Sequence, residues 1–279
     1  MNSVLAERLA ENIHRLALGI EPVDAARGSR VAHSVELALE NVPQPAWRWR
    51  PLRPGSEVSD ILAGVERHDS CRYVLRYRPG LSSPVDLRIF DRSRRFAPRR
   101  LRVPIHGAAE LLAEPPVALA GRVRRPVLYP GAAYDICETS TGIRGRILRG
   151  GVPMRWARIE ARLGAEVVGR AHGDDRGDFL LLIALPRTHV GGVADPLPVV
   201  VTVFGPDVAP APSRPDLPQL DGLWDLPLEV LGLPGAPDPT SAGDVPPTGY
   251  RLSNVDPRVH VDLPLGRMSS AAIAPFQFT

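Results

Sequence analysis

The densest group of residues able to do chemistry is a run of arginines about a third of the way along the chain. Seven fall within fifteen residues, and they are Arg88, Arg92, Arg94, Arg95, Arg99, Arg100 and Arg102. A guanidinium binds carboxylates and phosphates through parallel hydrogen bonds, so such a run suits an acidic protein surface or a nucleic acid. Single strands of nucleic acid also need interleaved aromatic residues for stacking, and only Phe90 and Phe96 are present. We therefore favour an exposed strand face and turn, then contact with acidic segments of this chain or a neighbour, and last nucleic acid.

Two other clusters have the residue types of a reactive site but not its spacing. The segment 67–71 (Arg-His-Asp-Ser-Cys) contains a nucleophile and a base, but consecutive residues of an extended chain cannot converge on one substrate atom. The segment 173–178 carries three carboxylates, but it lacks the alternating ligands of a calcium loop. The seven histidines form no HxH or HxxxH pair, and Cys71 and Cys137 form no CxxC motif. We predict no catalytic residue, no cofactor and no metal.

The composition favours short strands over long helices. Proline and glycine together make 56 of the 279 residues, and each proline removes a backbone donor. All 34 basic residues are arginine, which either codon bias or persistent protein interfaces would explain, and the net charge of +3 does not imply nucleic-acid binding. The first residues carry acidic side chains where a signal peptide needs an apolar core, and no run is long enough to span a bilayer. These features predict a cytoplasmic protein without a membrane span, located there freely or within a particle assembled there.

The N-terminal residues 1–28 are expected to contain a short amphipathic helix. Apolar residues recur at helical spacing from Val4 to Ala17, Ser3 offers a cap, and Gly19 offers an end. Such a helix either covers the protein's own core or docks on a partner, and we favour the first interpretation.

Residues 29–107 are expected to form a first antiparallel β-domain. Apolar and polar residues alternate in four segments, with Trp47 and Trp49 on one face of the first. The segments are 46–51, 72–78, 85–90 and 101–105. Turn-forming residues lie between them. A connector rich in proline follows at 108–134.

Residues 135–205 are expected to form a second β-domain with a more specific pattern. A strand that begins near Thr141 ends in a Gly-Gly-x-Pro turn at 150–153, and a second strand alternates over 154–163. Asp175, Gly177 and Phe179 then form an Asp-x-Gly-x-Phe hairpin, in which Asp175 can bond its own turn and Gly177 takes the positive-φ position. This order over 141–185 resembles the carboxypeptidase regulatory-like (transthyretin-like) domain. The resemblance implies a β-sandwich that serves as a rigid spacer or interaction domain and carries no chemistry of its own.

The last segment, 206–279, differs in composition from the rest. It has 14 prolines in 74 residues and a net charge of −5, whereas the preceding residues have a net charge of +8. These features predict an extended arm. Its apolar residues are spaced like anchors, and among them we select Trp224, Phe276 and Phe278 as candidate contacts with a protein surface, its own or a neighbour's.

The expected fold is therefore mainly β: two small antiparallel β-sandwiches with a short N-terminal helix and an extended proline-rich arm. Two β-modules, an arm and no assembled active site favour a non-enzymatic structural or adaptor subunit whose partners are the protein subunits of an assembly. Cytoplasmic synthesis combined with rigid β-modules and wrapping arms is loosely similar to phage-tail-like contractile injection particles. The alternatives are a stand-alone bacterial binding module for a carbohydrate or surface protein, and, third, an enzyme of unrecognised class.

Overall fold

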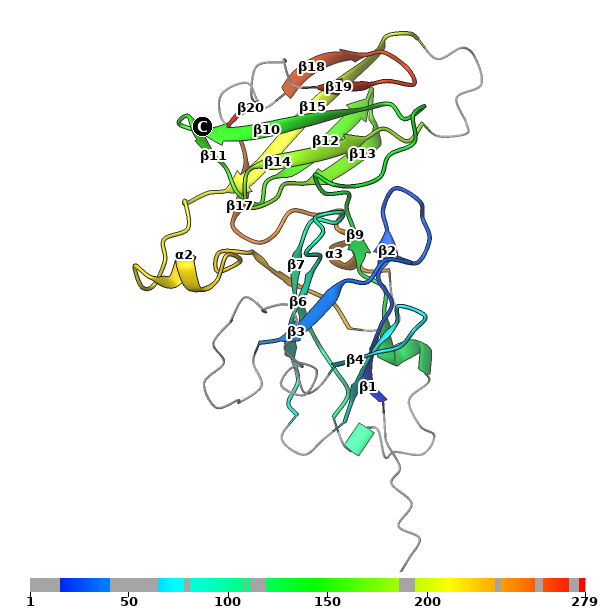
Figure 1. The fold of residues 1–279 in the computed structure, drawn as a ribbon, viewed down its shortest axis with the longest axis vertical. Coiled ribbons are helices and arrows are strands. Elements are labelled where there is room, and N and C mark those ends of the chain that lie inside the picture. The colour runs from blue at the N-terminus through cyan, green and yellow to red at the C-terminus, as the bar shows by residue number, and fades with distance from the viewer. Residues whose placement is uncertain are drawn as a thin grey trace, which may run out of the picture.

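The computed structural model describes residues 16–40, 65–77, 81–107, 109–110, 119–185, 194–233, 237–253, 258–270 and 276–278. The described chain is mainly strand, which confirms the predicted fold class, and the helices α2 (Leu217–Leu220) and α3 (Pro239–Ala242) have only four residues each. Two β-sandwiches lie one above the other along the long axis of the molecule, with α3 between them (Figure 1). No helix in these ranges is long and apolar enough to cross a membrane.

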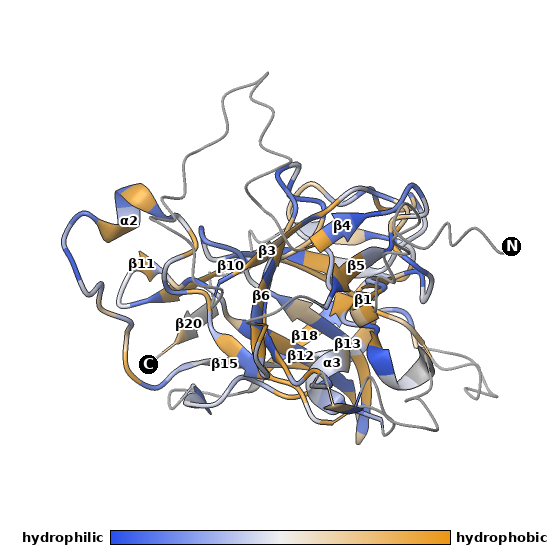
Figure 2. Ribbon diagram, turned by 90° about the horizontal axis from the view of Figure 1, so that it is seen from below, coloured by the Kyte–Doolittle hydropathy of each residue, from blue (hydrophilic) through white to orange (hydrophobic). Residues whose placement is uncertain are grey.

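The first sandwich has two sheets of four strands. One sheet has the order β4-β5-β1-β8, with β4 (Val65–Arg67), β5 (Tyr73–Arg76), β1 (Leu16–Ile20) and β8 (Val123–Arg124). The other has the order β16-β7-β6-β3, with β16 (Leu228–Val230), β7 (Arg99–Val103), β6 (Val85–Phe90) and β3 (Glu36–Leu39). The alternating residues predicted at 85–90 and 101–105 supply its core, which includes Leu87, Ile89, Leu101 and Val103. The edge strand β4 is mostly hydrophilic (Figure 2), and its Glu66 and Arg67 are exposed.

The second sandwich has two sheets of five strands. In one, β10 (Gly142–Arg149) pairs with β11 (Val152–Pro153), β14 (Asp178–Leu182), β19 (Met268–Ser270) and β20 (Phe276–Phe278). The other has the order β13-β12-β15-β17 and also contains β18; its strands are β13 (Glu166–His172), β12 (Arg158–Leu163), β15 (Leu197–Pro206), β17 (Tyr250–Leu252) and β18 (Arg258–Leu263). Most pairs are antiparallel, but β19 and β20 run parallel to β10. A two-stranded sheet of β2 (Val23–Asp24) and β9 (Val127–Leu128) lies between the sandwiches (Figure 1).

Strand β14 is shared by the two hydrophobic cores. Phe179 and Leu181 belong to the core of the second sandwich, whereas Leu180 and Leu182 pack against the core of the first. Successive side chains of a strand point to opposite faces, so a run of four apolar residues places two on each side. Strand β14 therefore brings the two cores into contact.

The hairpin before β14 follows the predicted turn with one difference. Gly177 has a φ of +74°, as its predicted role requires, but the aspartate that bonds the turn is Asp174 and not Asp175. The Asp174 carboxylate accepts hydrogen bonds from the backbone N–H groups of Arg176 and Asp178 at 2.8 and 3.0 Å.

Replacement of Gly177 by alanine is expected to lower the free energy of unfolding by about 2 kcal/mol or more, because left-handed backbone costs about 1–2 kcal/mol for a residue with a Cβ atom. The new Cβ would also lie 2.9 Å from the carbonyl oxygen of Ile147. The matched control is Gly164→Ala, where φ is +62° but nothing lies within 4 Å, so only the backbone cost applies. Urea unfolding of both variants measures the difference, and equal losses would contradict the steric part of the prediction.

The structure differs from the predicted N-terminal helix where it can be compared. Leu16 and Ala17 are in strand β1, and Ala17 and Leu18 are buried in the first core. Gly19, the predicted helix end, lies inside the same strand and pairs with Val123. Burial on both faces of β1 explains its apolar run, which helical spacing also fits. Residues 4–15 of that prediction, and Trp47 and Trp49, lie outside the described residues.

The segment 206–279 also differs from the predicted arm, because it completes both sandwiches. After β15 the chain adds β16 to the first sandwich, parallel to β7, and then returns to add β17 to β20 to the second. Its buried apolar residues are Leu226, Leu231, Val261, Leu263 and Phe278. Prolines 227, 246, 247 and 264 lie between these short strands, where they interrupt no ladder. The prolines thus limit strand length without preventing burial.

Candidate functional site

The arginine run of 88–102 is largely neutralised within the chain. Six of its members form ion pairs: Arg88 with Glu40 and Asp221, Arg92 with Glu36, Arg94 with Asp174 and Asp175, Arg99 with Glu229, Arg100 with Glu40, and Arg102 with Asp86. Among the described residues, no carboxylate lies within 4 Å of the exposed Arg95 side chain. Asp221 and Glu229 come from the acidic C-terminal segment, so the run contacts that segment of its own chain.

Arg99 is the most completely buried of these arginines, with none of its surface exposed. Its guanidinium donates two hydrogen bonds to the Glu229 carboxylate, at 3.2 and 2.7 Å. The other three N–H groups of the guanidinium donate hydrogen bonds to the backbone carbonyls of Val127, Thr240 and Ser241. All five guanidinium N–H groups therefore have an acceptor, which is the condition for burying an arginine without a large loss of stability.

Glu229 connects the two sandwiches through a second arginine. Its carboxylate also accepts a hydrogen bond from Arg158 of β12 at 3.1 Å, while Arg99 belongs to β7 and Glu229 itself to β16. Burial alone would raise the pKa of Glu229, but Arg99 and Arg158 hold it below its ordinary value. We call Arg99, Arg158 and Glu229 the junction cluster; it joins one strand of the second sandwich to two strands of the first.

A histidine and a tyrosine pack beside the junction cluster. His172 of β13 lies opposite Arg158 in the sheet register, and its ring stacks on Tyr129 with a centroid distance of 4.1 Å. Tyr129 donates a hydrogen bond from its hydroxyl to the carbonyl of Ala242 in α3. Gly243 covers the stack with a φ of +74°, and a Cβ there would lie 2.7 Å from the Tyr129 ring. Only glycine fits this position.

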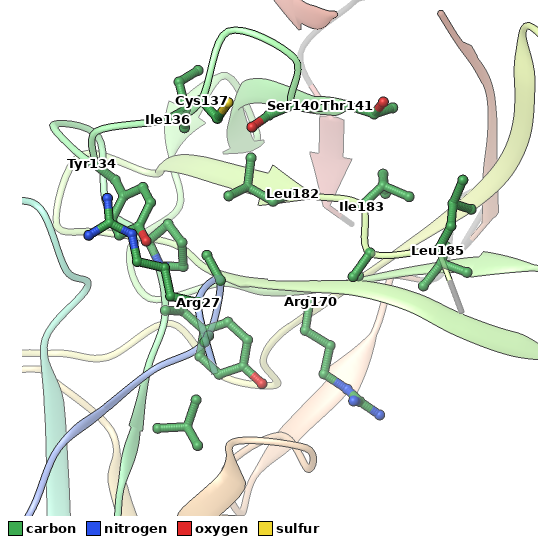
Figure 3. Close-up of a pocket in the computed structure, with 18 of the residues that line it drawn as sticks. Arg27, Tyr134, Ile136, Cys137, Ser140, Thr141, Arg170, Leu182, Ile183 and Leu185 are labelled. Carbon is green, nitrogen blue, oxygen red and sulfur yellow. The ribbon is translucent and has the colours of Figure 1, made fainter. Parts of the chain in front are cut away.

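A cavity of about 640 Å³ lies between the sandwiches next to this region. Figure 3 shows Leu182, Ile183 and Leu185 along one side, with Arg27 and Tyr134 close together on another. The Arg27 guanidinium lies 5.6 Å from the centre of the Tyr134 ring. Cys137 is exposed on the rim, where a hydrogen bond with Thr139 lowers the pKa of its thiol. No histidine lines this cavity within the described residues, so the thiol has no neighbouring imidazole there.

A second cavity of about 270 Å³ opens where the arginine run meets the Asp174 turn. Arg94 and Trp156 line it, and both have a positive φ, 59° and 61°. Arg94 pairs with Asp175 at 3.0 Å, which forms a second ionic contact between the sandwiches. This contact is partly exposed and contributes less stability than the junction cluster.

The three aromatic residues predicted to contact a surface differ in how the structure places them. Trp224 is half-buried, and Phe276 lies in β20 opposite Ile147 of β10. Phe278 is fully buried in the second core, and the guanidinium groups of Arg149 and Arg251 lie 4.4 and 4.9 Å from its ring centre. Phe278 is therefore part of the protein's own core, which is one of the two kinds of surface that its prediction left open.

Sequence reasoning did not select Glu229, Arg158 or His172. The available signal was a charged residue in an apolar run, since Glu229 stands between Leu228 and Val230. Arg158 and His172 occur in alternating strands, where a polar residue is ordinarily taken as exposed. The described ranges contain no group of three or more metal-ligating side chains. Comparison of the chain with protein-family models, with curated proteins and with solved structures gives no match.

Proposed function

We propose that this chain is a non-enzymatic structural or adaptor subunit of a larger protein assembly, of the kind found in phage-tail-like contractile injection particles. The observation that carries the proposal is the junction cluster, in which the buried charges of Arg99, Arg158 and Glu229 pair with one another and join the two sandwiches. A buried ion pair specifies one arrangement of the elements that supply it, because any other leaves a charge without a partner. A fixed arrangement of two β-modules suits a rigid spacer, which holds neighbouring subunits at a constant distance and orientation.

Two further features support the same function. The sequence pattern of 141–185 resembles the carboxypeptidase regulatory-like domain, and that resemblance implies a module used as a rigid spacer. The C-terminal segment ties both sandwiches together through β16 and β17 to β20. The space beside Arg158 of the junction cluster is about 30 Å³, which is too small for a substrate.

The proposal is tested by the size of the complex that contains the chain in the cells that produce it. We expect an affinity-tagged chain to sediment with large particles, at a constant ratio to sheath, tube or baseplate proteins identified by mass spectrometry. Recovery only as a free monomer would contradict the proposal. The neighbouring genes provide an independent check, because genes for those proteins are expected beside this one.

The 640 Å³ cavity favours one alternative, a stand-alone binding module for a carbohydrate or a surface protein. A free monomer that binds an immobilised glycan or bacterial surface protein, and loses binding when Arg27, an exposed residue that lines the cavity, is replaced by alanine, would support this alternative over the assembly.

A further inference from the structure

His172 occupies an unusual position for a titratable side chain. Its exposed fraction is 2%, and its ring is held between Tyr129 and Gly243. Neither ring nitrogen makes a hydrogen bond of good geometry within the described chain, although the backbone of Gly243 lies close enough to favour the charged ring slightly. Nε of Arg158 also has no partner there. Buried polar atoms are ordinarily paired, because leaving one unpaired lowers the stability of the folded state. The closed arrangement around His172 is therefore already costly when the ring is neutral.

The covering segment closes a small space over this histidine. A cavity of about 30 Å³ is lined by Arg158 and Glu160 of β12, by Arg170 and His172 of β13, and by residues 243–246. The register places Arg158 opposite His172 and Glu160 opposite Arg170, so these four side chains share one face of the sheet. The opposite face carries Ile159 and Ala171, which belong to the second core. The segment 243–246 is thus the cover of a polar sheet face.

The charged groups around His172 leave no carboxylate available to it. Arg158 and Arg99 both act against a positive charge on the ring. Glu229 is held by those two arginines, Glu160 by Arg162 and Arg170, and Asp244 of the cover by Arg170 at 2.8 Å. A proton on His172 would therefore place a further buried positive charge beside two guanidinium groups.

We propose that His172 is an acid-sensitive latch: when its imidazole gains a proton, the segment 239–246 detaches from the sheet β13-β12-β15-β17 and the junction loosens. This inference goes beyond the proposed function and does not depend on it. The detached ring reaches water, where the imidazolium is hydrated and no longer faces Arg158. Detachment also breaks three hydrogen bonds. The Tyr129 hydroxyl loses the carbonyl of Ala242 as its acceptor, and Arg99 loses the carbonyls of Thr240 and Ser241.

The sign of the pH dependence follows from the burial. Burial, with Arg158 and Arg99, holds the pKa of His172 well below its ordinary value of 6.5 in the closed state. The open state has the ordinary pKa and binds more protons once the pH falls below about 6.5. The latch therefore contributes its full stability above that pH, and the open state gains up to about tenfold in relative population for each pH unit below it.

Hydrogen exchange of the full chain, read by mass spectrometry on peptides covering 239–246, tests the latch. The intrinsic exchange rate of an amide falls as the pH is lowered, so we compare protection factors, which correct for it, at about pH 7 and pH 5. We expect the protection factor of this segment to fall at least tenfold at the lower pH, while that of Leu197–Pro206 in β15 is kept. An unchanged factor in 239–246, or an equal loss in both segments, would overturn the proposal.

A pair of variants isolates the histidine. His172→Phe retains a ring for Tyr129 to stack on and cannot gain a proton, so its protection factor in 239–246 is expected to be the same at both pH values. The matched control is His260→Gln, an exposed histidine on β18 whose loss is expected to leave the pH dependence unchanged. If His172→Phe does not fold, the comparison of the two segments in the parent chain decides the question alone.

Discussion

The Glu229→Gln chain is expected to unfold with a free energy about 3–5 kcal/mol lower than that of the parent chain, because removing one partner of a buried ion pair leaves the other charge without compensation. Glutamine preserves the shape of the side chain, so the loss reports on charge and not on a cavity. Two guanidinium groups are affected, since Arg99 and Arg158 both pair with this carboxylate. Urea unfolding followed by tryptophan fluorescence gives the measurement, since Trp156 is buried close to the cluster.

The matched control is Glu160→Gln. Glu160 also pairs with two arginines, Arg162 and Arg170, but its side chain is 13% exposed and both partners reach solvent. Screened pairs of this kind contribute about 1 kcal/mol or less. Equal losses of unfolding free energy for the two variants would show that burial of the junction cluster does not increase its contribution. That result would contradict the interpretation that buried charges fix the arrangement of the two sandwiches.

The second large effect is expected in the core of the second sandwich. Phe278→Ala should lower the free energy of unfolding by about 3–5 kcal/mol, the usual cost of truncating a buried phenylalanine. Phe278 is fully buried in the second core, and two arginines lie over its ring. Both the transfer of the ring from water and the favourable cation–aromatic contacts are lost.

Val208→Ala serves as the comparison for Phe278→Ala. It is an apolar residue of the same C-terminal segment, but its exposed fraction is 78%, so its truncation is expected to change stability by no more than about 0.5 kcal/mol. Urea unfolding measures both variants. A loss below about 1 kcal/mol for Phe278→Ala would be inconsistent with a final strand that packs in the core.

Strands with a clear alternation could be predicted from the sequence, and those that depend on distant partners could not. The segment 85–90 alternates and lies in the middle of a sheet, so its period reveals it. Strand β16 has only three residues and is held by pairing with β7, more than 120 positions earlier in the chain. Leu16 and Ala17 fit both a helical and a buried-strand pattern, and tertiary packing decided between them.

Some features of the candidate site could likewise be predicted from the sequence, and others could not. The density of arginines between 88 and 102 is visible in the sequence, and so is the acidic character of the C-terminal segment. Which carboxylate meets which arginine is not, because Arg99 and Glu229 are separated by 130 positions. His172 carries no signal beyond its place in an alternating strand, since its burial results from the segment that returns to cover it.

The path of the C-terminal segment has a consequence for the order of events during synthesis. Strand β10 is parallel to β20, and the ladder between them can form only after Phe276, the partner of Ile147, has been synthesised. At the usual rate of about 5–20 residues per second, these 129 positions take roughly 6–26 s to translate. During that interval one edge of β10 has no strand beside it, and unpaired edges are the common route to wrong association between nascent chains. The interval between the two strands is therefore the period in which a chaperone would be of most use to this protein.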